Sequence, residues 1–394
     1  MSSAENPSLR RRLGSGDAVV IGLGSMIGAG VFVVFGPAAA AAGPGLLIGL
    51  AVAAVVAYCN ATSSSRLAAL YPLSGGTYVY GRERLGEFWG YLAGWSFVVG
   101  KTASCAAMAL TVGLYLWPAR AHVVAVAAVV ACAAVNYRGV AKSALLTRVI
   151  VAVVLAVLAG VVVAVGVSGR ADPSRITLSG GHAAGILQAA GLLFFAFAGY
   201  ARIATLGEEV RDPARTIPRA IRWCLAIALT VYLTVAITVL SILGPQLAGS
   251  AAPLADAVRA AGSGGLEPLV RIGAAVAALG SLLSLILGVS RTGLAMARDG
   301  HLPSALSAIH PRFGVPHRAE VAVGTLVAVV AAVADVRAAI GFSSFAVLLY
   351  YAIANASAWT LSPSAARRVI PATGLTGCLL LMATLPLGAA VADR

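Results

Sequence analysis

Residues 21–32 read Ile21-Gly22-Leu23-Gly24-Ser25-Met26-Ile27-Gly28-Ala29-Gly30-Val31-Phe32, which places four glycines inside a segment apolar enough to cross a membrane. Glycine destabilises a helix because it loses the most backbone freedom on folding. Hydrocarbon offers no hydrogen-bond partners, so unwound backbone at membrane depth persists only where it lines a cavity or lies against protein. Such a break is the best sequence pointer to the binding site of a transporter. The stretch therefore predicts a spanning helix that is broken near Gly28.

The alternative explanation for these glycines is close helix–helix packing. One small-xxx-small pair, such as Gly24 with Gly28, would be enough for that purpose. The chain continues with Gly36-Pro37 and Gly43-Pro44-Gly45. This density of helix-breaking residues favours the broken helix.

The composition is that of an integral membrane protein. Of the 394 residues, 60% are hydrophobic and 11% are charged, so no sizeable soluble domain is expected. The five cysteines form no CxxC pair, which argues against a disulfide framework or a zinc site, and we expect no metal and no cofactor. The net charge of +14 is spread over short loops. It therefore indicates membrane topology rather than a nucleic-acid partner.

Apolar runs of roughly 20 residues predict eleven spans in the lipid bilayer. They are expected at 16–41, 44–70, 84–117, 121–137, 144–167, 184–207, 220–243, 268–297, 319–334, 338–361 and 369–390. The loops on the N-terminal side hold most of the Lys and Arg residues, which predicts a multi-pass protein of the cell (plasma) membrane with a cytoplasmic N-terminus. No cleavable signal peptide is expected, because the first apolar run is of full length.

A second break is expected in the span 184–207, where Gly199 and Arg202 interrupt a long apolar run. The two breaks lie 199 − 28 = 171 residues and five spans apart. Discontinuous helices at corresponding positions of two halves are typical of inverted-repeat transporters, with the binding site between the halves. The predicted fold class is an all-α membrane protein of about eleven helices, a five-plus-five inverted repeat whose first and sixth spans are broken.

Four stretches, in chain order, carry a family resemblance. They read GSMIGAGVF at 24–32, YPLSGGTYVY at 71–80, GEEVRDPARTIP at 207–218 and ARDGHLP at 297–303. In these motifs the chain resembles permeases of the amino acid–polyamine–organocation (APC) superfamily. The resemblance implies secondary transport of amino acids by alternating access, in a family whose members usually have twelve spans.

The domain organisation follows from the spans and the resemblance. We expect a cytoplasmic tail over 1–15, a ten-helix transporter core over 16–361 and an additional C-terminal transmembrane helix over 362–394. A helix missing from the usual twelve would lie outside the transport core.

Residues at the first break are predicted to bind the substrate. A second half-helix starting near Ala29 would present free backbone N–H groups and a positive dipole end, which suit a carboxylate. We therefore assign Gly28, Ala29 and Gly30 to the substrate carboxylate. The carbonyls freed near Ser25 and Met26 would face the substrate ammonium.

The resemblance adds further pocket positions. It places Phe195 as an aromatic gate over the substrate and Ala198 in contact with it, although Phe195 could instead serve lipid or core packing. It places Leu285, flanked by Ser284, at a position that sets the pocket volume.

Lys101 is the most unusual side chain, because it lies roughly 25 Å along the span 84–117. A cation at this depth is expensive unless it pairs or faces a polar cavity, so its default interpretation is functional. The alternative is a side chain that extends to the membrane surface. In the pocket, Lys101 would repel a cationic side chain, pair with an acidic one, or lose its proton when buried and act as a proton carrier.

Three residues are candidates for coupling or gating. Ser281 is the hydroxyl that the resemblance places at a sodium-type site, which is weak support for sodium, and a proton is the expected coupling ion. Arg202 and Glu208 lie just after the second break, where a gating role and a structural ion pair are both open.

Other classes of function fit poorly. An enzyme would need converging nucleophiles, acids or metal ligands, and no Asp or Glu falls mid-span. A channel would require rings of like polar residues. The remaining choice is between amino acids and amines, polyamines or other small organic cations, and Lys101 argues against a purely cationic substrate. Symport or exchange and the oligomeric state stay open.

Overall fold

A computed structural model of the chain describes residues 14–71, 75–139, 144–176, 180–200, 203, 210–361 and 364–385, and this part is helical without a β-sheet. The helices are α1 (Ser15–Met26), α2 (Gly30–Val33), α3 (Phe35–Ala42), α4 (Leu46–Leu70), α5 (Thr77–Leu85), α6 (Glu87–Leu116), α7 (Ala121–Tyr137), α8 (Ala144–Val167), α9 (Ala183–Phe197), α11 (Pro213–Leu243), α12 (Pro253–Ala260), α13 (Glu267–Arg298), α14 (His317–Val333), α15 (Val336–Trp359) and α16 (Ala365–Thr384). Short 3-10 turns join several of them. The predicted all-α fold class is confirmed.

Nine helical stretches among the described residues are long and apolar enough to cross a membrane. The two predicted spans that are not among the nine correspond to α14, which has only 17 residues, and to α16, which contains Pro371. The count of eleven therefore stays a prediction, and so does the inverted repeat that would relate the two halves.

The first predicted break is confirmed. Helix α1 ends at Met26, and Ile27 leaves the helical region with ψ of 58°. The chain becomes helical again only at Gly30. A Cβ added to Gly30 would lie 2.8 Å from Ala196 Cα, so the absence of a side chain lets α2 approach α9 closely.

The second break lies directly against the first. Helix α9 ends at Phe197 and continues as the 3-10 turn η4 (Ala198–Tyr200). A Cβ on Gly199 would stand 2.2 Å from Ser25 O and 2.6 Å from Met26 N. The backbones of the two breaks are therefore in contact, and a larger residue than glycine does not fit between them.

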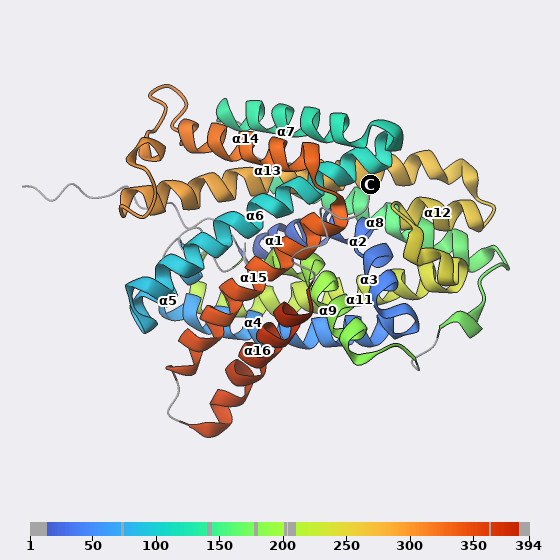
Figure 1. Cartoon of the computed structure of the whole chain (residues 1–394), viewed down its shortest axis with the longest axis horizontal. Helices are drawn as coiled ribbons and strands as arrows, with labels where there is room; N and C mark the ends of the chain where they lie inside the picture. Colours follow the sequence, from blue (N-terminus) through green and yellow to red (C-terminus); the bar gives the residue numbers. More distant parts are fainter. Residues whose placement is uncertain are drawn as a thin grey trace, which may run out of the picture.

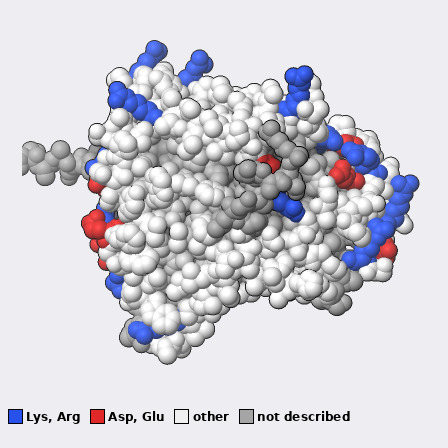
Figure 2. All heavy atoms as spheres, viewed as in Figure 1, with Lys and Arg blue, Asp and Glu red and all other residues white. Residues whose placement is uncertain are grey.

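The remaining helices surround these breaks. Helix α6 crosses the molecule and packs against α13 and α15, while α4 packs against α9 (Figure 1). Helices α7 and α14 pack together on one flank, and α16 packs against α15 and α4 on the other (Figure 1). Figure 2 shows a broad uncharged surface between charged side chains that gather mainly toward the left and right ends of the view. This distribution is that of a protein whose middle lies in hydrocarbon.

An ion-pair cluster ties helix ends together at the end of the molecule opposite α5. Glu267 at the start of α13 accepts from Arg259 of α12 at 2.6 Å and pairs with Arg271 at 2.7 Å. Arg271 also donates to the Tyr115 carbonyl of α6 at 2.8 Å. The cluster fixes α6 relative to α13, the two helices that form much of the cavity wall described below.

The contact between the breaks gives a first prediction. Gly199→Ala forces the backbones of Gly199 and Ser25 apart, so we expect it to destabilise the protein by about 2 kcal/mol or more. The measurement is the midpoint of thermal unfolding of the purified protein in detergent. Gly160→Ala is the control, because a Cβ there meets nothing within 4 Å. Equal midpoints for both variants would contradict the close contact.

Candidate functional site

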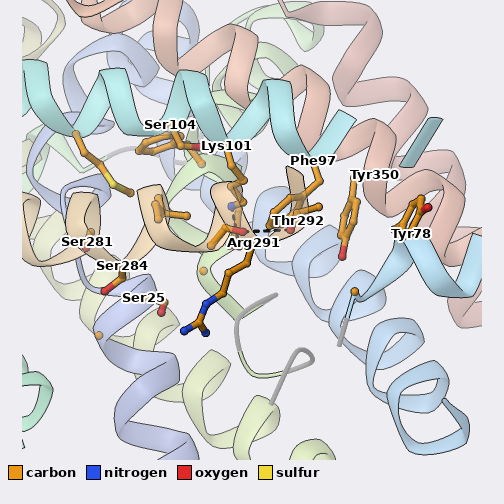
Figure 3. A pocket seen from close by; sticks show the side chains of 18 of the residues that line it. Ser25, Tyr78, Phe97, Lys101, Ser104, Ser281, Ser284, Arg291, Thr292 and Tyr350 are labelled. Carbon is orange, nitrogen blue, oxygen red and sulfur yellow. Dashed lines mark hydrogen bonds between the residues drawn. The ribbon is translucent and has the colours of Figure 1, made fainter. Parts of the chain in front are cut away.

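A cavity of about 220 Å³ lies where the two breaks meet α6 and α13 (Figure 3). Its lining comes from segments far apart in the sequence, namely Gly24, Ser25, Gly75, Tyr78, Phe97, Lys101, Ser104, Met108, Phe195, Ala198, Gly199, Ser281, Ser284, Leu285, Gly288, Arg291, Thr292, Ala295 and Tyr350. The space is smaller than the roughly 300–1,000 Å³ of pockets for drug-sized ligands. It suits a small molecule.

Many of the residues predicted for the site line this one cavity. They are Ser25, Lys101, Phe195, Ala198, Ser281, Ser284 and Leu285. They come from α1, α6, α9, η4 and α13, so the fold brings them together from distant parts of the chain. Their roles toward a substrate stay predictions.

Other predicted residues lie behind the cavity wall. Met26, Gly28, Ala29 and Gly30 are buried and are not part of the lining. A Cβ on Gly28 would lie 2.1 Å from Ser281 Oγ, so Gly28 backs directly onto a lining residue. The close helix–helix packing that was the alternative explanation for these glycines is therefore present together with the break. Arg202 and Glu208 lie outside the described residues.

Lys101 joins α6 to the second break. The residue is 5% exposed, and its Nζ donates to Ala198 O at 3.3 Å (Figure 3). Ala198 opens η4, where the regular α-helical pattern of α9 has ended. The amine therefore binds a helix-break carbonyl and does not extend to the membrane surface. Within the described ranges no carboxylate pairs with it.

Tyr232 of α11 connects the carbonyls at the two breaks. Its Oη lies 2.6 Å from Met26 O and 2.9 Å from Ala196 O, both in donor geometry. A hydroxyl carries a single proton, so the two carbonyls share it. The carbonyl of Met26, predicted to face the substrate ammonium, is thus engaged by protein.

Hydroxyl groups of the lining present acceptors to the cavity. Ser25 Oγ, Ser284 Oγ and Thr292 Oγ1 each donate to the carbonyl one turn earlier in their own helix, at 3.0, 3.0 and 3.2 Å. Because the proton of each hydroxyl is used in this way, only oxygen lone pairs remain for a ligand. Such oxygens suit an ammonium group.

At the α5 end, the cavity is bounded by a hydrogen-bonded cluster. Tyr78 Oη donates to Asp299 Oδ2 at 2.5 Å, and Arg82 Nη1 approaches the same oxygen at 3.3 Å. Burial, and then the hydrogen bond to Asp299, raise the pKa of Tyr78, so the phenol keeps its proton across the physiological range. Since that proton goes to Asp299, His301 Nδ1 at 2.9 Å acts as the donor to Tyr78 Oη.

Arg291 was not among the residues predicted from the sequence, although it lines the cavity from α13 and is exposed. A signal was available, because Ser284, Gly288, Arg291 and Ala295 follow the i, i+4, i+7, i+11 spacing of one helix face. Because Ser284 was predicted to line the pocket, the same helix face places Arg291 in the pocket wall as well. Among the lining residues that the structure describes there are two cations and no carboxylate. Among the described residues, no three His, Cys, Asp or Glu side chains gather as metal ligands.

The shared proton of Tyr232 gives a second prediction. Tyr232→Phe leaves the buried carbonyls of Met26 and Ala196 without this donor, so we expect a loss of about 1–3 kcal/mol in the free energy of unfolding. The check is denaturation of the purified protein beside Tyr58→Phe, whose ring lies on α4 and is 50% exposed. If Tyr232→Phe were as stable as Tyr58→Phe, the hydroxyl would not hold the breaks together.

Comparison with known proteins places this site in a family. The amino acid permease family model matches residues 17–379. An uncharacterized transporter of Mycobacterium tuberculosis is 71% identical over 388 residues, which cover 98% of this chain and 88% of the relative. The branched-chain amino acid permease BcaP of Bacillus subtilis is 28% identical over 81% of this chain and 74% of its own length. Human cationic amino acid transporter 4 is 30% identical over 89% of this chain and 59% of its own length. The chain belongs to the amino acid permease family of the APC superfamily and is a multi-pass membrane transporter, not an enzyme.

Proposed function

We propose that this transporter moves amino acids across the cell membrane by alternating access, either in symport with protons or by exchange. The observation that carries the proposal is the small cavity at the contact of the two helix breaks, which holds a buried cation and several hydroxyl acceptors. An amino acid needs both kinds of partner, because it carries a carboxylate and an ammonium group. The match to the amino acid permease family supports the same substrate class.

The substrate would lie between the first break and α13. Its ammonium would meet the oxygens of Ser25 and Ser284, which have lone pairs to offer. Its carboxylate would meet the N–H groups of Gly28, Ala29 and Gly30, because the first N–H groups of a helix have no intrahelical partner. These residues lie behind Ser281 here, so a small movement of α13 from α1 is part of the proposal.

The proposed orientation turns the end of the cavity that holds the exposed Arg291 toward the cytoplasm. The distribution of Lys and Arg over the loops supports a cytoplasmic N-terminus. The exposed Arg291 and the Tyr78–Asp299 contact both lie near the C-terminal end of α13, which would then be the cytoplasmic end. Alternating access requires a second conformation in which this end closes and the opposite end opens.

Lys101 is our candidate for the proton carrier. A buried amine without a carboxylate partner among the described residues gives up its proton more readily than an exposed one, so it can release a proton and take it up again during the transport cycle. Its hydrogen bond to Ala198 O would link its protonation to the second break. Ser281 offers the alternative of sodium coupling, because its Oγ is buried and has no hydrogen-bond partner in the part of the chain that the structure describes.

Transport of amines, polyamines or other small organic cations is the alternative function. The cavity wall argues against it, because Lys101 and Arg291 are cationic and the described part of the lining holds no Asp or Glu. A substrate without a carboxylate would have no negative group to offer these cations.

The direct test is uptake into proteoliposomes that contain the purified protein. A panel of labelled amino acids and a labelled polyamine would be assayed with and without a proton gradient. We expect uptake of at least one amino acid, increased by an inward proton gradient or by internal amino acid. Uptake of the polyamine alone would refute the proposal.

A third prediction concerns Lys101. Lys101→Ala should abolish the pH dependence of uptake between external pH of about 5.5 and 7.5, because the group that takes up the proton is gone. Lys101→Arg should also fail, since guanidinium stays protonated. Thr102→Ala is the matched control, because its hydroxyl bonds the Val98 carbonyl of the same helix. A wild-type pH profile in Lys101→Ala would exclude Lys101 as the carrier.

A further inference from the structure

We infer that the preferred substrates carry a second carboxylate, and that Arg291 is the residue that binds it. The inference rests on the proposed function and specifies its substrate class as acidic amino acids. It starts from the charge of the cavity wall. Lys101 and Arg291 are the charged residues in the described part of the lining, and both are cations.

The two cations occupy different depths of one cavity. Lys101 is 5% exposed and binds Ala198 O beside the second break, whereas Arg291 is exposed. Figure 3 shows their side chains extending toward the same space from α6 and α13. A substrate whose α-carboxylate and ammonium lie at the breaks would therefore direct its side chain along α13 toward Arg291.

Arg291 is available to a ligand. Among the described residues its guanidinium makes no ion pair and no hydrogen bond, although it has five N–H donors in a planar fork. The buried Glu320 of α14 lies within its electrostatic influence, but both carboxyl oxygens of Glu320 lack a hydrogen-bond partner in this part of the chain. A carboxylate of the substrate can bind the fork through two parallel hydrogen bonds.

Other side chains complement this surface less well. A cationic side chain would add a third positive charge beside Lys101 and Arg291, and no carboxylate among the described lining residues would offset it. A neutral side chain would leave the guanidinium without a charged partner among the described lining residues. An acidic side chain compensates the charge.

The test compares substrates of equal shape that differ in charge. Purified wild-type protein in proteoliposomes would be assayed with labelled aspartate and asparagine, and with labelled glutamate and glutamine. We expect the acidic member to have a kcat/KM about 10- to 100-fold higher in at least one pair, the range for a hydrogen bond to a charged group. Equal uptake of both members, or preference for the amide in both pairs, would overturn the inference.

Variants assign this preference to Arg291. Arg291→Gln should lower the kcat/KM of the acidic member more than that of the amide, so that the preference is lost, and Arg291→Lys should restore part of it. Arg298→Ala is the matched control, because this exposed arginine lies two turns further along α13 and does not line the cavity. An equal loss of both substrates in Arg291→Gln would show a structural or gating role and would contradict the assignment.

Two outcomes separate this inference from the proposed function. If neutral amino acids are transported and acidic ones are not, only the inference fails. If no amino acid of the full panel is taken up, the proposed function itself fails. If Arg291→Gln cannot be recovered as folded protein, two measurements still test whether Arg291 binds the second carboxylate. They are the wild-type ratio of aspartate to asparagine uptake and the effect of Arg291→Lys on that ratio.

Discussion

The structure depends on the contact between two interrupted helices. Gly199 lies so close to Ser25 that no Cβ fits between their backbones. Each break frees backbone groups in a region where lipid cannot bond them, so each must find partners within the protein. Placing the breaks against one another encloses those groups. The surrounding helices then provide hydrogen-bond donors for these backbone groups. The Tyr232 hydroxyl, for example, is shared by two of their carbonyls.

The cavity is a consequence of the same constraint. Helices that stop and restart at membrane depth cannot fill the space beside them as continuous helices do, and α6 and α13 close that space. Lys101 uses one freed carbonyl, that of Ala198, as its partner. The hydroxyls of Ser25 and Ser284 bond their own helices and leave acceptors for a ligand. The groups that form hydrogen bonds with the backbone are therefore the same groups that would bind a zwitterionic ligand.

The breaks and the all-α fold were predictable from sequence, because glycine density and hydropathy are local signals. Lys101 was predictable because a cation at membrane depth is rare. Two features were not predictable, and a third could be read only from a helix-face pattern. The packing of Gly28 against Ser281 depends on which helix lies behind it. The role of Tyr232 depends on carbonyls from two other helices. Arg291 lies near a helix end, so from the sequence it resembles the loop cations that set membrane topology. Only the helix face that it shares with Ser284 assigns it to the cavity.

The central claim is that amino acids bind in the cavity at the two breaks, and substrate protection of a cysteine tests it most directly. The five native cysteines are buried, so Ser284→Cys would introduce an accessible thiol in the cavity wall. Its rate of reaction with a water-soluble maleimide would be measured with and without a mixture of amino acids, beside Ser304→Cys on the exposed η7 turn (Ser304–Ser307). The account predicts slower modification at position 284 and no change at position 304. Equal rates at position 284 with and without saturating amino acids would contradict it.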